Sequence, residues 1–185
     1  MRKKLLSPLW LTVILIVAIV FGFLFWNIWE AKHYQPISWA TYTSPSGDFS
    51  VYLPGTPEVS LTHDVTAAGQ PFTTEAYAAS SEDGVFQVNK YAYDTPFLTN
   101  DPEKQMRSVL ETAAKSVRGT LVSSNYHTYK SHPATDFLIK TNDQFVKGRI
   151  IITSPQVEYY LAYDYTSEND DEAMYATFIN SFELQ

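Results

Sequence analysis

Cysteine is absent from this chain of 185 residues, and its absence excludes several kinds of chemistry. Without a thiol there is no disulfide, no cysteine nucleophile, no cysteine-ligated zinc and no acylated cysteine of the lipoprotein type. The Gly-x-Ser-x-Gly, Ser-x-x-Lys and His-Glu-x-x-His motifs of common hydrolases are missing as well. We therefore expect a protein that is not an enzyme, with a catalytic triad assembled only by folding left open as the alternative.

Basic residues are scarce beyond the amino terminus. Three of the 13 Lys and Arg residues are Arg2, Lys3 and Lys4, which leaves 10 to balance 20 acidic residues. A domain with such an acidic excess repels nucleic acid, so we predict no nucleic-acid partner.

Glycine is also rare, with seven residues in the chain. The stretch LPGTP at 53–57 contains one of them, whereas a phosphate-binding loop needs several glycines and a lysine at the start of a helix. Pro57 stands where a sortase signal requires glycine. We interpret residues 54–57 as a turn that ends a strand.

The longest apolar run of the chain lies between Leu5 and Trp29 and contains no charged residue. Because about 20 apolar residues span a hydrocarbon core of roughly 30 Å, the run predicts a transmembrane helix over residues 5–29. Trp10, Trp26 and Trp29 lie near its ends, where indole rings favour the membrane interface. We predict these three residues as membrane-interface anchors.

The flanking charges predict the orientation of that helix. A basic start at residues 1–4 precedes it, and the short polar connector at 30–38 follows it. This asymmetry predicts a cytoplasmic amino terminus in the cytoplasmic (inner) membrane, with residues 39–185 on the extracytoplasmic, periplasmic side. The alternative is a cleaved signal peptide, whose apolar region is only about 7–15 residues long and ends at small residues.

Alternation of apolar and polar residues predicts strands through most of residues 39–185. In DFSVYLP, the side chains of Phe49, Val51 and Leu53 share one face. Turn residues separate three further pairs of strand-like runs, and such consecutive hairpins favour an antiparallel sheet. The pairs are PFTTEAYAAS with VFQVNKYAYD, TLVSSNYHTYK with ATDFLIKT, and QFVKGRIIIT with VEYYLAYDY.

Two helices are expected in the same region. Asn100 or Asp101 caps the first, Pro102 takes its first position, and Gly119 follows its end. Its apolar stripe consists of Met106, Val109, Leu110, Ala113 and Val117. In the second helix, Met174, Phe178 and Phe182 recur at a spacing of four.

We expect Leu110 and Phe178 to be buried between helix and sheet. The predicted fold class is therefore α+β: a transmembrane helix followed by a mainly antiparallel sheet sandwiched by α-helices.

The segment SGDFSVYLPGTPEVS resembles the first strand of the PsbP-like domains. The hairpin around YAYD, the late EYYLAYDY strand and the closing FINSFEL follow the order of elements in that family, over roughly residues 40–184. The resemblance implies an antiparallel sheet sandwiched by helices and a binding or assembly role. It implies no particular site residues, because the shared pattern consists of turns and apolar positions.

The candidate metal-binding residues can be explained without a bound metal. His127 and His132 lie five positions apart, and a weak surface zinc or copper site there is the alternative to solvated histidines. The acidic stretch ENDDE at 168–172 lacks the spacing and the glycine of a calcium loop, so we interpret it as the cap of the second helix. We expect no cofactor and no metal.

Tyrosine is the one residue in excess, with 13 in the chain. In VEYYLAYDY, one face is predicted to hold Val157, Tyr159, Leu161, Tyr163 and Tyr165, which leaves Tyr160 on the other. Because tyrosine is favoured at interfaces, Tyr160 is the predicted partner-interface residue.

Two functions are compatible with these features. The first is a membrane-anchored accessory subunit or assembly factor whose domain docks on a larger membrane protein complex. The second is a small-molecule or lipid-binding module tethered at the outer face of the membrane. A large tyrosine-lined pocket favours the second function, and a flat, exposed tyrosine face favours the first.

Overall fold

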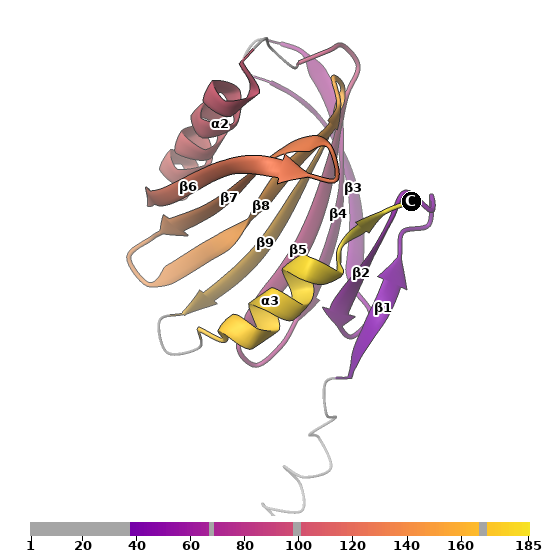
Figure 1. Ribbon diagram of the computed structural model, residues 1–185, viewed down its shortest axis with the longest axis vertical. Helices are drawn as coiled ribbons and strands as arrows, with labels where there is room; N and C mark the ends of the chain where they lie inside the picture. Colours follow the sequence, from indigo (N-terminus) through magenta and orange to yellow (C-terminus); the bar gives the residue numbers. More distant parts are fainter. Residues whose placement is uncertain (1–37, 67–68, 98–100, 167–169) are drawn as a thin grey trace, which may run out of the picture. The chain divides into compact units, whose positions relative to one another are not determined.

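A large antiparallel sheet dominates the computed structural model, which describes residues 38–66, 69–97, 101–166 and 170–185. Its seven strands have the order β3-β4-β5-β9-β8-β7-β6 (Figure 1). The three hairpins predicted from the sequence are confirmed as β4–β5, β6–β7 and β8–β9. The strands are β3 (Glu58–Val65), β4 (Pro71–Ser80), β5 (Gly84–Tyr93), β6 (Thr120–Tyr129), β7 (His132–Lys140), β8 (Gln144–Ser154) and β9 (Val157–Thr166).

A small sheet of three strands, in the order β1-β2-β10, packs on one face of the large sheet. Its strands are β1 (Trp39–Thr43), β2 (Phe49–Pro54) and β10 (Glu183–Leu184). As the alternation predicted, Phe49, Val51 and Leu53 point together into the core and are fully buried.

The LPGTP stretch is the connection between the two sheets. Strand β2 ends at Pro54 and β3 begins at Glu58, so the interpretation of this stretch as a turn is confirmed. Gly55 has a φ of +93° in this turn, a left-handed conformation that glycine adopts without strain.

Two helices lie on opposite faces of the large sheet: α2 (Pro102–Ser116) and α3 (Glu172–Ser181). The side chain of Asp101 caps α2 by accepting a hydrogen bond from the Lys104 amide at 3.0 Å. Asp171 caps α3 in the same way, accepting from the Met174 amide at 2.9 Å. The capping role predicted for the acidic stretch is therefore confirmed at Asp171, while residues 168 and 169 lie outside the described part.

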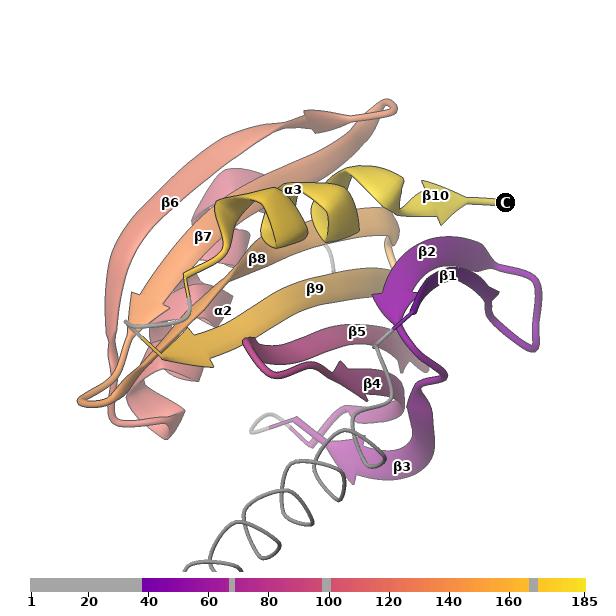
Figure 2. The ribbon, with the colours of Figure 1, turned by 90° about the horizontal axis from the view of Figure 1, so that it is seen from below.

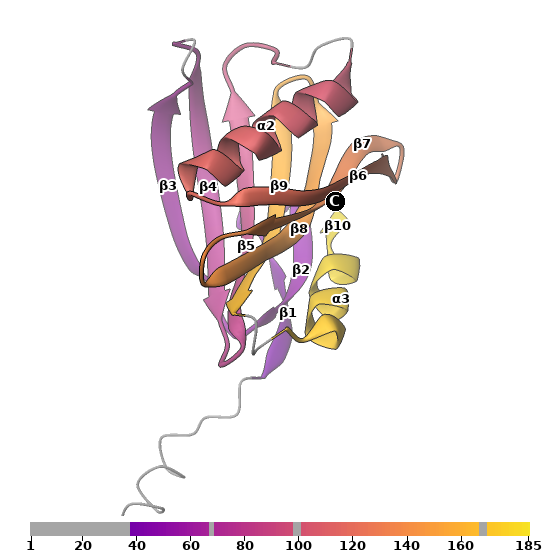
Figure 3. The same cartoon turned by 90° about the vertical axis from the view of Figure 1, so that its left-hand side faces the viewer.

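Each helix contributes to its own core. Helix α2 crosses the strands of the large sheet, as Figure 3 shows, and its Leu110 packs among Phe137, Ile139 and Ile150. Helix α3 and β2 lie on the opposite face (Figure 2). Phe178 of α3 lies in the core there with Phe86. Both Leu110 and Phe178 are 0% exposed, which confirms their predicted burial.

The predicted α+β fold class, a sheet sandwiched by α-helices, is wrong. Strands make up 58% of the described residues, and these residues form two antiparallel sheets with only two helices. Alternation in DFSVYLP predicts which side chains are buried but not which strand will pair with it. Because β2 pairs with β1 and β10, a second sheet occupies much of a layer that was assigned to helices.

The prediction of a signal-anchored protein of the cytoplasmic membrane, with an extracytoplasmic domain, is likewise corrected. Within the residues described, no helix is long and apolar enough to cross a membrane. Helix α2 has 15 residues and α3 has 10, against about 20 for a span. Residues 5–29, and with them Trp10, Trp26 and Trp29, lie outside the described residues.

Candidate ligand-binding groove

A groove with a volume of about 710 Å³ lies between α2 and the large sheet. Helix α2 packs on β6, β7 and β8, and the groove extends from the helix to residues of β3, β4 and β5. The apolar stripe of α2 is divided accordingly. Met106 and Leu110 are buried against the sheet, whereas Val109 and Val117 line the groove and are 38% and 50% exposed.

Aromatic side chains line the sheet side of the groove. Phe72 on β4 lies opposite Tyr93 on β5, with ring centroids 5.4 Å apart, and its ring is 6.1 Å from that of Tyr91. On β9, Tyr160 stacks on Phe137 with a centroid distance of 5.1 Å. These rings give the groove an apolar surface with several phenol hydroxyls.

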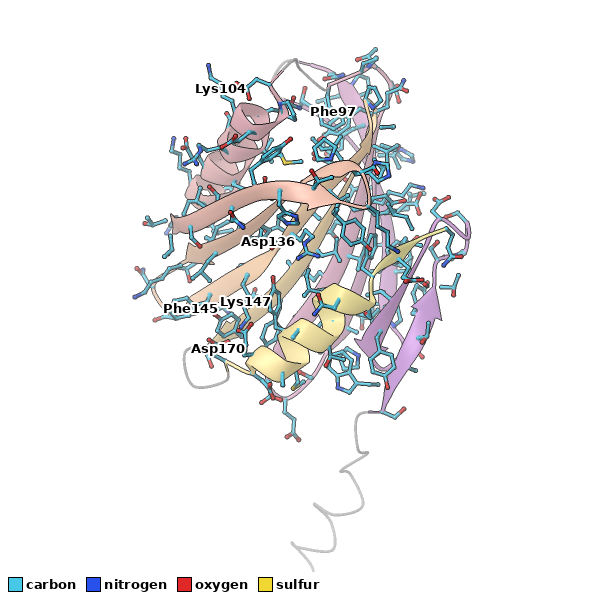
Figure 4. All side chains as sticks on the ribbon, viewed as in Figure 1. Phe97, Lys104, Asp136, Phe145, Lys147 and Asp170 are labelled. Carbon is cyan, nitrogen blue, oxygen red and sulfur yellow. The ribbon has the colours of Figure 1, made fainter. Side chains whose placement is uncertain are left out.

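Phe97 packs against one end of this aromatic surface. Its ring lies 4.4 Å from that of Tyr93, and its carbonyl accepts a hydrogen bond from the Gln105 side chain at 3.0 Å. Figure 4 places Phe97 near the start of α2, where Lys104 is also labelled. The contact ties the segment before α2 to the rim of the groove.

Glu158 is the one charged residue among the described residues that line the groove. It lies on β9 directly opposite Tyr91 on β5, and it is only 6% exposed. The Tyr93 hydroxyl donates a hydrogen bond to its Oε1 at 3.0 Å. In the described part of the chain, no Lys, Arg or His lies within ion-pair distance of this carboxylate.

The surroundings of Glu158 shift its protonation equilibrium. Burial raises the pKa of Glu158 from 4.5 to about 6, and the hydrogen bond from Tyr93 opposes that rise because it favours the charged form. Burial also raises the pKa of Tyr91, Tyr93 and Tyr160. At pH 7 the groove therefore holds a buried carboxylate surrounded by neutral phenols.

The opposite face of the large sheet contains a different charged cluster, centred on Lys147. Its ammonium lies 2.5 Å from Asp170 and 2.7 Å from Glu172, and Figure 4 shows Lys147 and Asp170 side by side. The rings of three tyrosines surround the same nitrogen at 4.7–5.7 Å: Tyr163, Tyr165 and Tyr175. Every charge in this cluster has a partner, so it fastens the start of α3 to β8.

The candidate site residues predicted from the sequence do not gather in one place. Tyr160 lies half-buried in the wall of the groove, and its role at a partner interface stays a prediction. His127 lies 3.2 Å from Asp136, whose carboxylate also accepts a hydrogen bond from Arg149 at 2.6 Å. No three His, Asp or Glu side chains gather as a metal site requires anywhere in the described ranges.

Sequence reasoning missed Glu158. The assignment of faces in VEYYLAYDY placed it beside Tyr160, on the face away from the predicted core, where a glutamate is ordinarily solvated. The available signal was a single acid at the start of a strand rich in aromatic residues. Glu158 contacts Tyr91 and Tyr93 of β5, a strand that is distant in the sequence.

No family model matches the chain, and neither does any curated protein. The resemblance to PsbP-like domains therefore stays a prediction.

Proposed function

We propose that this protein binds a small, largely apolar molecule in the groove between α2 and the large sheet. The observation that supports the proposal is the groove itself, with a volume of about 710 Å³ and walls of apolar and aromatic side chains. Ligand pockets typically measure about 300–1,000 Å³, with apolar walls and a few converging polar groups. Of the two functions predicted from the sequence, the geometry favours the ligand-binding module.

The helix wall also suits an apolar ligand. Thr112 and Ser116 line the groove, but their hydroxyls donate hydrogen bonds to carbonyls of α2, at Ser108 and Ala113. The hydroxyls are thereby partly satisfied within the helix, and Val109 and Val117, which flank them in the sequence, present only hydrocarbon. The other polar groups of the described lining are Glu158, the phenol hydroxyls and the hydroxyls of Thr66 and Ser108.

Docking on a larger protein complex was the other predicted function. An exposed, flat face bearing tyrosine would favour it, and Tyr160 was the predicted interface residue. Tyr160 instead lines a concave surface and packs on Phe137. This position supports a role of Tyr160 in ligand contact.

Titration with N-phenyl-1-naphthylamine, a neutral dye that fluoresces in apolar surroundings, tests the proposal. The full-length protein should enhance and saturate the dye fluorescence. Val109→Trp fills the groove from α2 and should weaken binding by about tenfold or more. Val122→Trp is the matched control, because Val122 is 54% exposed on β6 and does not line the groove.

The pattern across the two variants decides the result. Loss of binding in Val109→Trp with retention in Val122→Trp supports the groove as the binding site. No binding by the unchanged protein, or equal binding by both variants, overturns the proposal.

A further inference from the structure

We propose that the groove selects organic cations, and that an amine on the ligand binds the carboxylate of Glu158. This inference rests on the proposed function and names the chemical class of its ligand. The carboxylate of Glu158 is isolated: the residue is 6% exposed, and the Tyr93 hydroxyl donates a hydrogen bond to it at 3.0 Å. An ionised carboxylate accepts up to about four hydrogen bonds, so further donors are needed.

The protein does not supply a counter-ion from its described part. Glu158 is the one charged residue among the described residues lining the groove, and no cationic side chain pairs with it there. A buried charge without a partner is unfavourable unless a ligand completes the pair. An ammonium group on a bound molecule supplies both the charge and the missing donors.

The aromatic rings around Glu158 favour the same class of ligand. Tyr91 lies opposite Glu158 in the sheet, Tyr93 is hydrogen-bonded to it, and Phe72 packs against both rings. A cation over an aromatic face is attracted by the negative charge of the ring face. A carboxylate beside such rings therefore binds an amine and disfavours an anion.

The fold already contains one example of this recognition. On the opposite face, the ammonium of Lys147 is held by two carboxylates and by three tyrosine rings at 4.7–5.7 Å. The groove presents the same types of group, a carboxylate and tyrosines, but without a lysine among its described lining residues.

Binding should depend on pH through Glu158. The titratable groups that face it are Tyr91 and Tyr93 from β5 and Tyr160 from its own strand, while α2 contributes only Ser, Thr and apolar residues to the lining. The tyrosines stay neutral below pH 8, because burial raises their pKa values. Protonation of Glu158 below pH 6 removes the negative charge that attracts the amine.

Two probes of nearly equal shape test the inference by calorimetric titration of the full-length protein. 1-Naphthylmethylamine is a cation at pH 7.5, whereas 1-naphthalenemethanol is neutral. The amine should bind about tenfold more tightly or better at pH 7.5, a difference typical of a charge-assisted hydrogen bond. The preference should shrink to within about threefold at pH 5, because Glu158 is then protonated.

Glu158→Gln is the decisive variant, because the amide keeps an acceptor for Tyr93 but has no charge. It should lose the preference for the amine, so that the two probes bind within about threefold of each other at pH 7.5. Equal binding of the two probes at pH 7.5, or an undiminished preference in Glu158→Gln, overturns the inference and leaves the proposed function standing. Binding of neither probe, together with no binding of the neutral dye, overturns both.

Discussion

Replacing Phe178 by alanine should lower the free energy of unfolding by about 3–5 kcal/mol, the usual cost of removing a buried phenylalanine. Phe178 is 0% exposed and packs edge-on against Phe86, with ring centroids 5.3 Å apart. It joins α3 to the large sheet next to β2, so a cavity at this position loosens a whole layer of the core. Urea denaturation should show a lower midpoint with an unchanged slope.

Asn180→Ala is the control for that measurement. Asn180 is exposed on the same helix, so its replacement should change the free energy of unfolding by no more than about 0.5 kcal/mol. A loss below about 1 kcal/mol for Phe178→Ala would show that α3 does not form the core described above.

Replacing Glu158 by glutamine should raise the free energy of unfolding at pH 8 by about 2 kcal/mol and leave it nearly unchanged at pH 4. The reason is the rise of the Glu158 pKa from 4.5 to about 6 on burial, which corresponds to about 2 kcal/mol. Because the folded protein holds the proton more tightly, the contribution of Glu158 to stability is full below about pH 4.5. It is lost as the pH rises through about 6.

Thermal or urea unfolding of both proteins across this pH range checks the prediction. Tyr93→Phe should have the opposite effect at pH 8, because it removes the hydrogen bond that favours the charged form of Glu158. Glu111→Gln, at an exposed position of α2, is the control and should follow the unchanged protein. A stability difference between Glu158→Gln and the unchanged protein that does not vary with pH would contradict the burial of this carboxylate.

A glutamate that lowers stability at neutral pH is typical of a residue retained for binding. Glutamine has nearly the same shape and would accept the same hydrogen bond from Tyr93 at lower cost. Proteins commonly trade stability for function at their sites. The position of Glu158 in the groove is consistent with that trade.

Local signals in the sequence predicted local structure well. The capping aspartate and the proline after it predicted the start of α2, and the turn residues predicted the three hairpins. The apolar alternation predicted that Phe49, Val51 and Leu53 are buried. These features depend on hydrogen bonds and side-chain directions within a few residues, which short patterns determine.

The features that were missed depend on contacts between distant segments. Strand β2 pairs with β10, more than a hundred residues later, and no local pattern specifies that pairing. The groove is lined by residues of α2 and of six strands, and Glu158 lies against Tyr91 and Tyr93 of β5. The apolar stripe of α2 did contain a signal. It is wider than the helix needs for packing on the sheet, and its additional residues, Val109 and Val117, line the groove.

Methyl chemical shifts in NMR spectra, recorded with and without saturating 1-naphthylmethylamine, test most directly whether the groove is the binding site. Ile150 and Ile151 are neighbours on β8, but Ile150 lines the groove while Ile151 belongs to the core beneath α3. The ring current of the ligand should shift the methyl signals of Ile150, Val109 and Val117 and leave those of Ile151 and Ile179 in place. Shifts confined to Ile151 and Ile179, or no shifts at saturating ligand, would contradict the account.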